Sequence, residues 1–405
     1  MACVPVFYLP NTLFRLRDLV NGPKRLSIEC EATTFGTTMG LYRHFLRPLL
    51  FYFDAEKVHE RTLSAATAAG TSSTGRALLR RLCFHVTDHR LATDVAGIHF
   101  PNPVGLAAGF DKSGRAIRAL SEIGFGFVEI GSISAQPSVG NPKPRLFRLP
   151  EDEAIVVNYG VPNDGAAVVA RRVHAAPTPV PLGVNLVETN TGEPTDPAAV
   201  VGEFVAAARP FCGRADYLTL NLNCPNTTAG VSPFDDSSRL QELLQQFSRI
   251  DGLPPIFLKF TAHQDAKRAD DLLLAIDPYV SVAGFIFNLP PGKAYDLRTP
   301  ESVVDPMPGT LCGAPARTMM DDTISFWYGR MDRTKYAIIG SGGITCAEHA
   351  YHKILLGASL IQLYTGLVFH GPGLVRRIHR GLLQLLDRDG FTHLSQAIGA
   401  GHEED

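Results

Sequence analysis

The chain has 405 residues, of which 45% are hydrophobic and 19% charged, a composition typical of a soluble globular protein with a large core. Its formal net charge of −2 leaves no basic footprint for nucleic acid, so we expect no nucleic-acid partner. No apolar run reaches the roughly 18–20 residues that span a bilayer. The seven cysteines are scattered without a C-x-x-C pair, which favours reduced thiols over a disulfide framework or a metal site.

Residues 1–40 form an N-terminal segment whose role the sequence does not reveal. The segment has some apolar character between Val4 and Leu9, but it also contains Asp18, Glu29 and Glu31. Acidic residues at these positions fit neither a secretory signal nor an acidic-poor transit peptide. We therefore predict a poorly ordered extension.

Residues 41–88 have a helical pattern in which apolar stripes are edged by arginines, among them Arg43, Arg47, Arg80 and Arg81. Such stripes are typical of helices that lie on a membrane surface. A helical hairpin that caps the main domain, with solvated arginines, would give the same pattern. The pattern by itself leaves both interpretations open.

Residues 89–390 alternate between short apolar runs and amphipathic stretches, and residues 391–405 follow as a C-terminal tail. The eight strand-like runs cover residues 104–107, 127–130, 182–186, 217–220, 256–260, 283–287, 337–339 and 360–364. Helical patterns fall at 114–123, 197–209, 237–250, 265–276, 346–356 and 375–387. Eight alternating strands predict an α/β fold, a (β/α)8 TIM barrel with an N-terminal helical extension. A doubly wound sheet is the alternative, but no G-x-G-x-x-G motif follows an early strand.

Two glycine-rich turns follow the last two predicted strands. They are IGSGGI (residues 339–344) and YTG (residues 364–366). Glycines let backbone N–H groups approach a phosphate, and the ends of strands seven and eight are the usual phosphate site of this barrel. The pair therefore predicts a phosphorylated cofactor such as FMN.

Polar side chains stand at the ends of several other strands. The segment TLNLNCPNT (residues 219–227) offers Asn221, Asn223, Cys224 and Asn226, which suits a flat polar ring beside a proton-transfer group. An asparagine-rich turn with a buried cysteine is the plain alternative. Asn185, Asn288, Lys112 and Lys259 also follow apolar runs, so a ring of amides and two lysines is expected at one barrel face.

Several longer motifs resemble those of dihydroorotate dehydrogenases. They are NPVGLAAGFDK (102–112), GFGFVEIG (124–131), GNPKPRLFRL (140–149), GASLIQLYTG (357–366) and FHGP (369–372). The helical extension, with FDAEKVHE (53–60), resembles that of the class 2 members, which depend on quinone and associate with membranes. The similarity covers residues 41–380 in the right order.

The resemblance implies a role for each matching residue. FMN would be held by Ala107, Ala108, Gly109, Asn185, Asn221, Lys259, Gly313, Gly342, Gly343, Tyr364 and Thr365. The pyrimidine substrate would be held by Lys112, Tyr159, Gly160, Asn221, Asn226 and Asn288. His59 and Arg148 would line a quinone tunnel, which favours the membrane-facing interpretation of residues 41–88.

The sequence also departs from the family pattern. Cys224 stands where class 2 members have a serine and class 1 members a cysteine, and a thiol is acidic enough to serve as the base. Asn223 replaces a small serine, Cys312 another serine, and Val157 a substrate-binding asparagine. Val161, Pro162 and Leu289 replace a phenylalanine, an asparagine and a threonine. Each unpaired polar group of a bound substrate would cost roughly 1–3 kcal/mol.

Three hypotheses follow. In the first, the protein is a class 2-like dihydroorotate dehydrogenase, in which Cys224 removes the C5 proton, FMN N5 takes the C6 hydride and quinone reoxidises the flavin. In the second, a paralogue of the same fold acts on a less polar cyclic substrate. In the third, the protein binds flavin or lipid without catalysis. The first hypothesis predicts a protein that is peripherally bound to a membrane. This membrane would be a bacterial inner membrane, at its cytoplasmic face, or a mitochondrial inner membrane.

Overall fold

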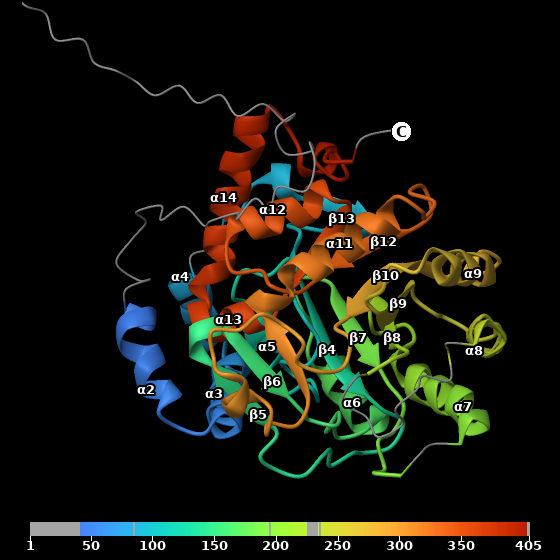
Figure 1. The fold of residues 1–405 in the computed structure, drawn as a ribbon, viewed down its shortest axis with the longest axis horizontal. Helices are drawn as coiled ribbons and strands as arrows, with labels where there is room; N and C mark the ends of the chain where they lie inside the picture. Colours follow the sequence, from blue (N-terminus) through green and yellow to red (C-terminus); the bar gives the residue numbers. More distant parts are fainter. Residues whose placement is uncertain (1–40, 84–85, 194–195, 225–233, 235, 403–405) are drawn as a thin grey trace, which may run out of the picture.

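Eight parallel strands close into a barrel, as predicted from the apolar runs (Figure 1). The computed structural model describes residues 41–83, 86–193, 196–224, 234 and 236–402. In barrel order the strands are β3 (Val104–Leu106), β4 (Phe127–Ile133), β7 (Leu182–Leu186), β8 (Tyr217–Asn221), β9 (Ile256–Thr261), β10 (Val282–Asn288), β12 (Ala337–Gly340) and β13 (Ala358–Leu363). The pairing of β13 with β3 closes the barrel, and the fold is a (β/α)8 TIM barrel.

Helices surround the barrel. They are α5 (Ile117–Leu120), α6 (Ala166–Ala175), α7 (Pro197–Ala208), α8 (Ser237–Phe247), α9 (Ala266–Ile276), α10 (Glu301–Val304), α11 (Arg317–Tyr328), α12 (Ala347–Leu355), α13 (Thr365–His370) and α14 (Gly373–Asp389). The side chains of Asp196, Asp236 and Asp265 accept backbone N–H bonds at the starts of α7, α8 and α9. The helix predicted over residues 114–123 is shorter than expected, and α6, α10, α11 and α13 lie outside the helical patterns named from the sequence.

Two small sheets complete the barrel domain. The hairpin of β1 (Thr93–Val95) and β2 (Ile98–Phe100) places Phe100 against Phe127, Tyr217 and Phe257 at the end of the barrel where the strands begin. The second sheet has the antiparallel order β11 (Thr310–Gly313), β6 (Ala154–Val157) and β5 (Leu146–Leu149). It carries Arg148, Val157 and Cys312 toward the functional end of the barrel.

The N-terminal helices gather at one side of the barrel, next to α13 and α14 (Figure 1). They are η2 (Leu41–Leu46), α2 (Arg47–Phe51), α3 (Ala55–Thr71) and α4 (Ser73–Cys83). α3 packs closely on α5, because a Cβ at Gly70 would lie 3.1 Å from the backbone nitrogen of Ala119. Phe45 and Leu49 are 71% and 59% exposed, and Tyr52, Leu78 and Leu82 are exposed as well. No helix in the described ranges is long and apolar enough to cross a bilayer.

The residues after α14 return to the barrel. Leu394 lies in the short η8 turn (Leu394–Gln396), and both Leu394 and Ala397 are fully buried. The first part of the segment predicted as a C-terminal tail therefore belongs to the core. The remaining short turns are η3 (His89–Leu91), η4 (Pro150–Asp152), η5 (Arg209–Phe211) and η7 (Ala314–Ala316).

Cys83, Cys212, Cys224 and Cys312 are free thiols, as expected from the scattered positions of the cysteines.

Candidate active site

A cavity of about 220 Å³ lies at the carboxyl ends of the barrel strands, where this fold places its active sites. The predicted residues that line it are Ala107, Ala108, Gly109, Lys112, Tyr159, Asn221, Cys224, Lys259, Asn288, Gly313, Gly342, Gly343, Tyr364 and Thr365. Asn185 and Gly160 do not line the cavity; Asn185 is fully buried beside it. Asn226 lies outside the described residues, as do residues 1–40. We call this space the barrel cavity.

The turn after β12 requires glycine at two positions. Gly342 and Gly343 have φ angles of 86° and 70°. A Cβ would lie 2.7 Å from Met320 Cγ at the first position and 2.4 Å from Arg317 Cβ at the second. The bare backbone can therefore approach an oxyanion closely.

Gln362 offers a second sign of a missing ligand. Its side chain lines the barrel cavity and donates to Glu129, but its buried Oε1 has no hydrogen-bond partner. A buried acceptor without a partner is costly, and a flat ring with an N–H edge would satisfy it. Together with the glycine turn, this atom fits the predicted FMN.

The amides at the strand ends form one connected chain. Asn288 Nδ2 donates to Asn221 Oδ1 at 2.7 Å, and Asn221 Nδ2 donates to Ser132 Oγ at 3.1 Å. Ser132 Oγ donates to Asn185 Oδ1 at 2.5 Å, and Asn185 Nδ2 donates to Glu129 Oε1 at 2.8 Å. The predicted ring of amides is therefore present, but Ser132 and Glu129, which connect it, were not predicted.

Lys112 is one of two lysines that line the barrel cavity, the other being Lys259. The Nζ of Lys112 donates to the Gly109 carbonyl at 2.6 Å and lies 3.7 Å from the centroid of the Tyr159 ring. Burial lowers the pKa of Lys112 to about 8, and the nearby Glu60 charge opposes this shift. The amine is therefore charged at neutral pH and positioned to bind a carboxylate.

Two free thiols line the barrel cavity. Burial raises the pKa of Cys312 to about 12, although Lys259 acts in the opposite direction. Cys312 therefore stays protonated at neutral pH and is unsuited to act as a base. Cys224 is only partly buried and stands just after β8, three residues beyond Asn221. Of these two thiols, Cys224 is the candidate for proton transfer.

The wall that departs from the family pattern is apolar. Val157, Val161 and Leu289 all line the barrel cavity. Val161 has a φ of 49°, a left-handed conformation that strains a β-branched residue. The backbone therefore has an unusual conformation at this wall of the cavity.

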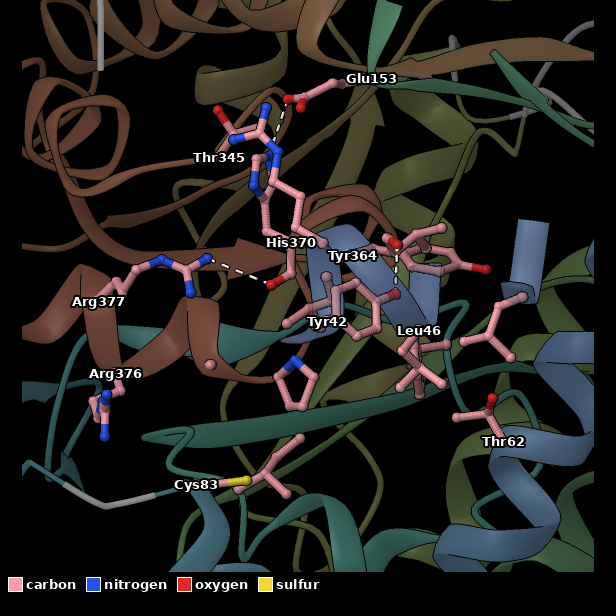
Figure 2. Close-up of a pocket in the computed structure, with 18 of the residues that line it drawn as sticks. Tyr42, Leu46, Thr62, Cys83, Glu153, Thr345, Tyr364, His370, Arg376 and Arg377 are labelled. Carbon is pink, nitrogen blue, oxygen red and sulfur yellow. Dashed lines mark hydrogen bonds and ion pairs between the residues drawn. The ribbon is translucent and has the colours of Figure 1, made fainter. Parts of the chain in front are cut away.

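A larger cavity of about 980 Å³ adjoins the first, and we call it the helix cavity (Figure 2). It is lined by α2, α3, α4, α13 and α14, and Tyr364 and Thr345 line both cavities. His59 and Arg148, the two residues predicted to line a quinone tunnel, line the helix cavity. Most of its lining is apolar, with Arg376 and Arg377 at one side (Figure 2).

His59 stands between the rings of Phe110 and Tyr364, with centroid distances of 5.1 and 6.4 Å. Burial, with Lys112 nearby, lowers the pKa of His59 to about 3, so its ring is neutral. Its Nε2 is buried without a hydrogen-bond partner. Arg148 donates to the carbonyls of Leu50 and Phe53, which ties α2 to the sheet of β5.

The sequence and the fold are similar to those of known proteins. Residues 90–386 match the family model described as dihydroorotate dehydrogenase. A dihydroorotate dehydrogenase (quinone) of Acidithiobacillus ferrooxidans is 40% identical over 369 residues, which cover 88% of this chain and 98% of that protein. One of Halobacterium salinarum is 38% identical over 361 residues with the same coverage. A ligand-free DHODH structure from Eimeria tenella aligns with a TM-score of 0.68 at 28% identity, covering 82% of this chain and 99% of that one. The chain belongs to the dihydroorotate dehydrogenase family.

Proposed function

We propose that this protein oxidises dihydroorotate to orotate with bound FMN and passes the electrons to a quinone. The observation that carries the proposal is the contact between two unlike cavities. The barrel cavity gathers Lys112, Cys224 and the amides, the helix cavity is mostly apolar, and Tyr364 lines both. This arrangement suits a polar substrate on one side of a redox cofactor and an apolar electron acceptor on the other. The named relatives favour this first hypothesis over a paralogue or a non-catalytic protein.

FMN would be held by the residues that line the barrel cavity around the glycine turn, with Gly342 and Gly343 at its phosphate and Lys259 and Asn221 at its ring. When bound, the flavin supplies the acceptor for a hydride. The 89–390 segment is then the FMN-binding barrel.

Lys112 would bind the substrate carboxylate, since its amine stands beside the Tyr159 wall of the cavity and is charged at neutral pH. Asn221 and Asn288 would hold the ring, and Tyr159 would form one wall. Cys224 would take the proton from C5 of the ring as a thiolate. The role assigned to Asn226 remains a prediction from the family resemblance.

The quinone would enter the helix cavity, with His59 and Arg148 among its contacts. The exposed side chains of Phe45, Leu49 and Tyr52 on η2 and α2 suit insertion into a membrane surface. Residues 41–88 would then be the membrane- and quinone-facing segment, and the protein would sit peripherally on a bacterial or mitochondrial inner membrane.

Vesicle binding tests the membrane part of the proposal. We expect the double variant Phe45→Ser/Leu49→Ser to sediment with phospholipid vesicles at least tenfold less than the unchanged protein, while flavin reduction by dihydroorotate is retained. Leu274→Ser is the matched control, because Leu274 on α9 is 77% exposed but far along the chain from the N-terminal helices. Equal vesicle binding by all three proteins would refute the membrane-facing role.

A further inference from the structure

A buried carboxylate lies beneath the barrel cavity. Glu129, in the middle of β4, is fully buried and does not line the cavity. Its Oε1 accepts from Asn185 Nδ2 at 2.8 Å. Its Oε2 accepts from Tyr217 at 3.0 Å, Thr219 at 3.1 Å and Gln362 at 2.8 Å. Four donors from three strands therefore converge on two oxygens, and the group acts only as an acceptor.

This acceptor fixes the orientation of each amide above it. Asn185 must turn its NH2 toward Glu129, so its carbonyl oxygen faces Ser132. Ser132 must then give its one proton to Asn185, which leaves only lone pairs for Asn221. Asn221 must therefore present its NH2 to Ser132 and its carbonyl oxygen to Asn288. The hydrogen bonds of this amide chain therefore all run in one direction, with each donor pointing from Asn288 toward Glu129 and each amide between them fixed by its neighbour.

The direction determines what a ligand meets in the barrel cavity. Asn288 Nδ2 uses both of its hydrogens, one on Asn221 Oδ1 and one on the Asn223 carbonyl at 2.6 Å. Its Oδ1 is then the atom left for a ligand, and it is an acceptor. Asn221 has its carbonyl engaged and one N–H left, so it offers a donor. A ring that places an N–H toward Asn288 and a carbonyl toward Asn221 matches this pattern.

We infer that Glu129 is a positioning residue that sets the donor and acceptor pattern of the amides facing substrate and flavin, and so selects cyclic ligands with an N–H at the Asn288 position. The substrate part of this inference rests on the proposed function. Burial, with the Glu129 charge adding to it, raises the pKa of Tyr217 well above its usual value, so Tyr217 remains a donor to the carboxylate.

Glu129→Gln is the test, because the amide has the same size but brings an NH2 group where four donors now converge. We expect the hydrogen bonds of the amide chain to lose their single direction. Asn288 would then no longer present only a hydrogen-bond acceptor to the ligand. Dissociation constants of orotate, 1-methylorotate and 3-methylorotate are measured from changes in the visible spectrum of the flavin. For each methylated ligand, its dissociation constant is divided by that of orotate, and the larger of the two ratios is the readout. This methylation ratio should be about tenfold or more in the unchanged protein, as one hydrogen bond implies, and should fall to within threefold of unity in Glu129→Gln.

Tyr217→Phe is the matched control. It removes one donor to Glu129 Oε2 but leaves the carboxylate and the direction of the chain intact. We expect a lower melting temperature with an unchanged methylation ratio. A ratio that changes equally in Tyr217→Phe and Glu129→Gln would overturn the inference, because general loosening would then explain both.

A second readout separates this inference from the proposed function. FMN affinity of the apoprotein, measured by quenching of flavin fluorescence, should fall at least fivefold in Glu129→Gln and stay within twofold in Tyr217→Phe, since Asn185 and Asn221 belong to the chain. If the unchanged holoprotein fails to bind orotate, the proposed function is wrong, and flavin affinity alone decides the role of Glu129. Unchanged flavin affinity and an unchanged methylation ratio in Glu129→Gln would overturn the inference.

Discussion

Arg145 joins the N-terminal helices to the wall of the barrel cavity through a buried ion pair with Glu56, whose Oε1 lies 2.8 Å from Arg145 Nη2. Glu56 lies in the first turn of α3, and Arg145 immediately precedes β5. The same guanidinium lies 5.3 Å from the centroid of the Tyr159 ring, which also contacts Lys112. The helical extension and the substrate-binding wall therefore share one charged contact.

Glu56→Gln should lower the free energy of unfolding by about 3–5 kcal/mol, because it leaves Arg145 buried without its charged partner. Burial by itself would raise the pKa of Glu56, but hydrogen bonds from Arg145 and Lys143 outweigh it, and the net pKa is lowered from 4.5. The contribution should thus be complete above pH 4.5 and disappear as pH falls through the lowered value. Urea denaturation at pH 7 and at lower pH measures both.

The control for this prediction lies one turn along the same helix. Glu60 pairs with Arg115 at 3.0 Å, but both side chains are exposed. Glu60→Gln should change the free energy of unfolding by about 0–1 kcal/mol, as is typical of surface pairs. An equal loss in the two variants would show that burial of the Glu56 pair does not matter.

Loss of the charge on Lys112 should cause kcat/KM for dihydroorotate to fall at high pH. Its pKa is lowered to about 8, so the amine loses its charge above that pH and the substrate carboxylate loses its partner. We expect kcat/KM for dihydroorotate to fall above pH 8. Lys112→Met should remove this decrease and lower kcat/KM by on the order of 10–100-fold at pH 7. A decrease that persists in Lys112→Met belongs to another group.

Much of the fold could be predicted from the sequence, because strands that are buried on both faces consist of continuous apolar runs. All eight barrel strands were found this way. The helix α11 was missed because Asp321 stands on its buried face, paired with Lys353 at 2.5 Å, and breaks the apolar pattern. The strands β5, β6 and β11 are only four residues long, and β11 lies far along the chain from the hairpin of β5 and β6, so no local pattern reveals the whole sheet.

The site was predicted where residues follow strands directly, as Lys112, Asn221 and Cys224 do. Ser132 and Glu129 were missed as the links between amides, although a glutamate inside the apolar run of β4 is a signal that could have been noticed. The adjoining of the two cavities at Tyr364 depends on packing between α3, α13 and the barrel, which spacing along the chain does not encode.

Val157 should limit the affinity for orotate. It is buried on β6 and lines the barrel cavity where an amide would add a hydrogen bond to the ligand. Val157→Asn should tighten orotate binding by about 0.5–1.5 kcal/mol, or roughly 2–12-fold. Spectral titration of the flavin measures this, with Val157→Leu as an apolar control. Weaker binding in Val157→Asn would mean that the substrate does not reach this wall.

Ionisation of Cys224 should determine how the rate of flavin reduction rises with pH. Cys224→Ala should lower the rate of flavin reduction by about 10²–10⁴-fold, the usual contribution of a general base. Cys224→Ser should retain some rate and shift its rise to higher pH, because an alcohol is less acidic than a thiol. Stopped-flow reduction across pH 5–10 tests this. A rate in Cys224→Ala equal to that of the unchanged protein would remove Cys224 from the mechanism.

The most direct test of the account is an anaerobic one. The purified protein is mixed with dihydroorotate, and the visible absorbance of the flavin is followed before and after a soluble quinone analogue is added. We predict rapid bleaching by dihydroorotate and recovery of the absorbance with the quinone. A flavin that dithionite reduces but millimolar dihydroorotate does not would contradict the central claim, and would show that the apolar wall of Val157, Val161 and Leu289 serves another substrate.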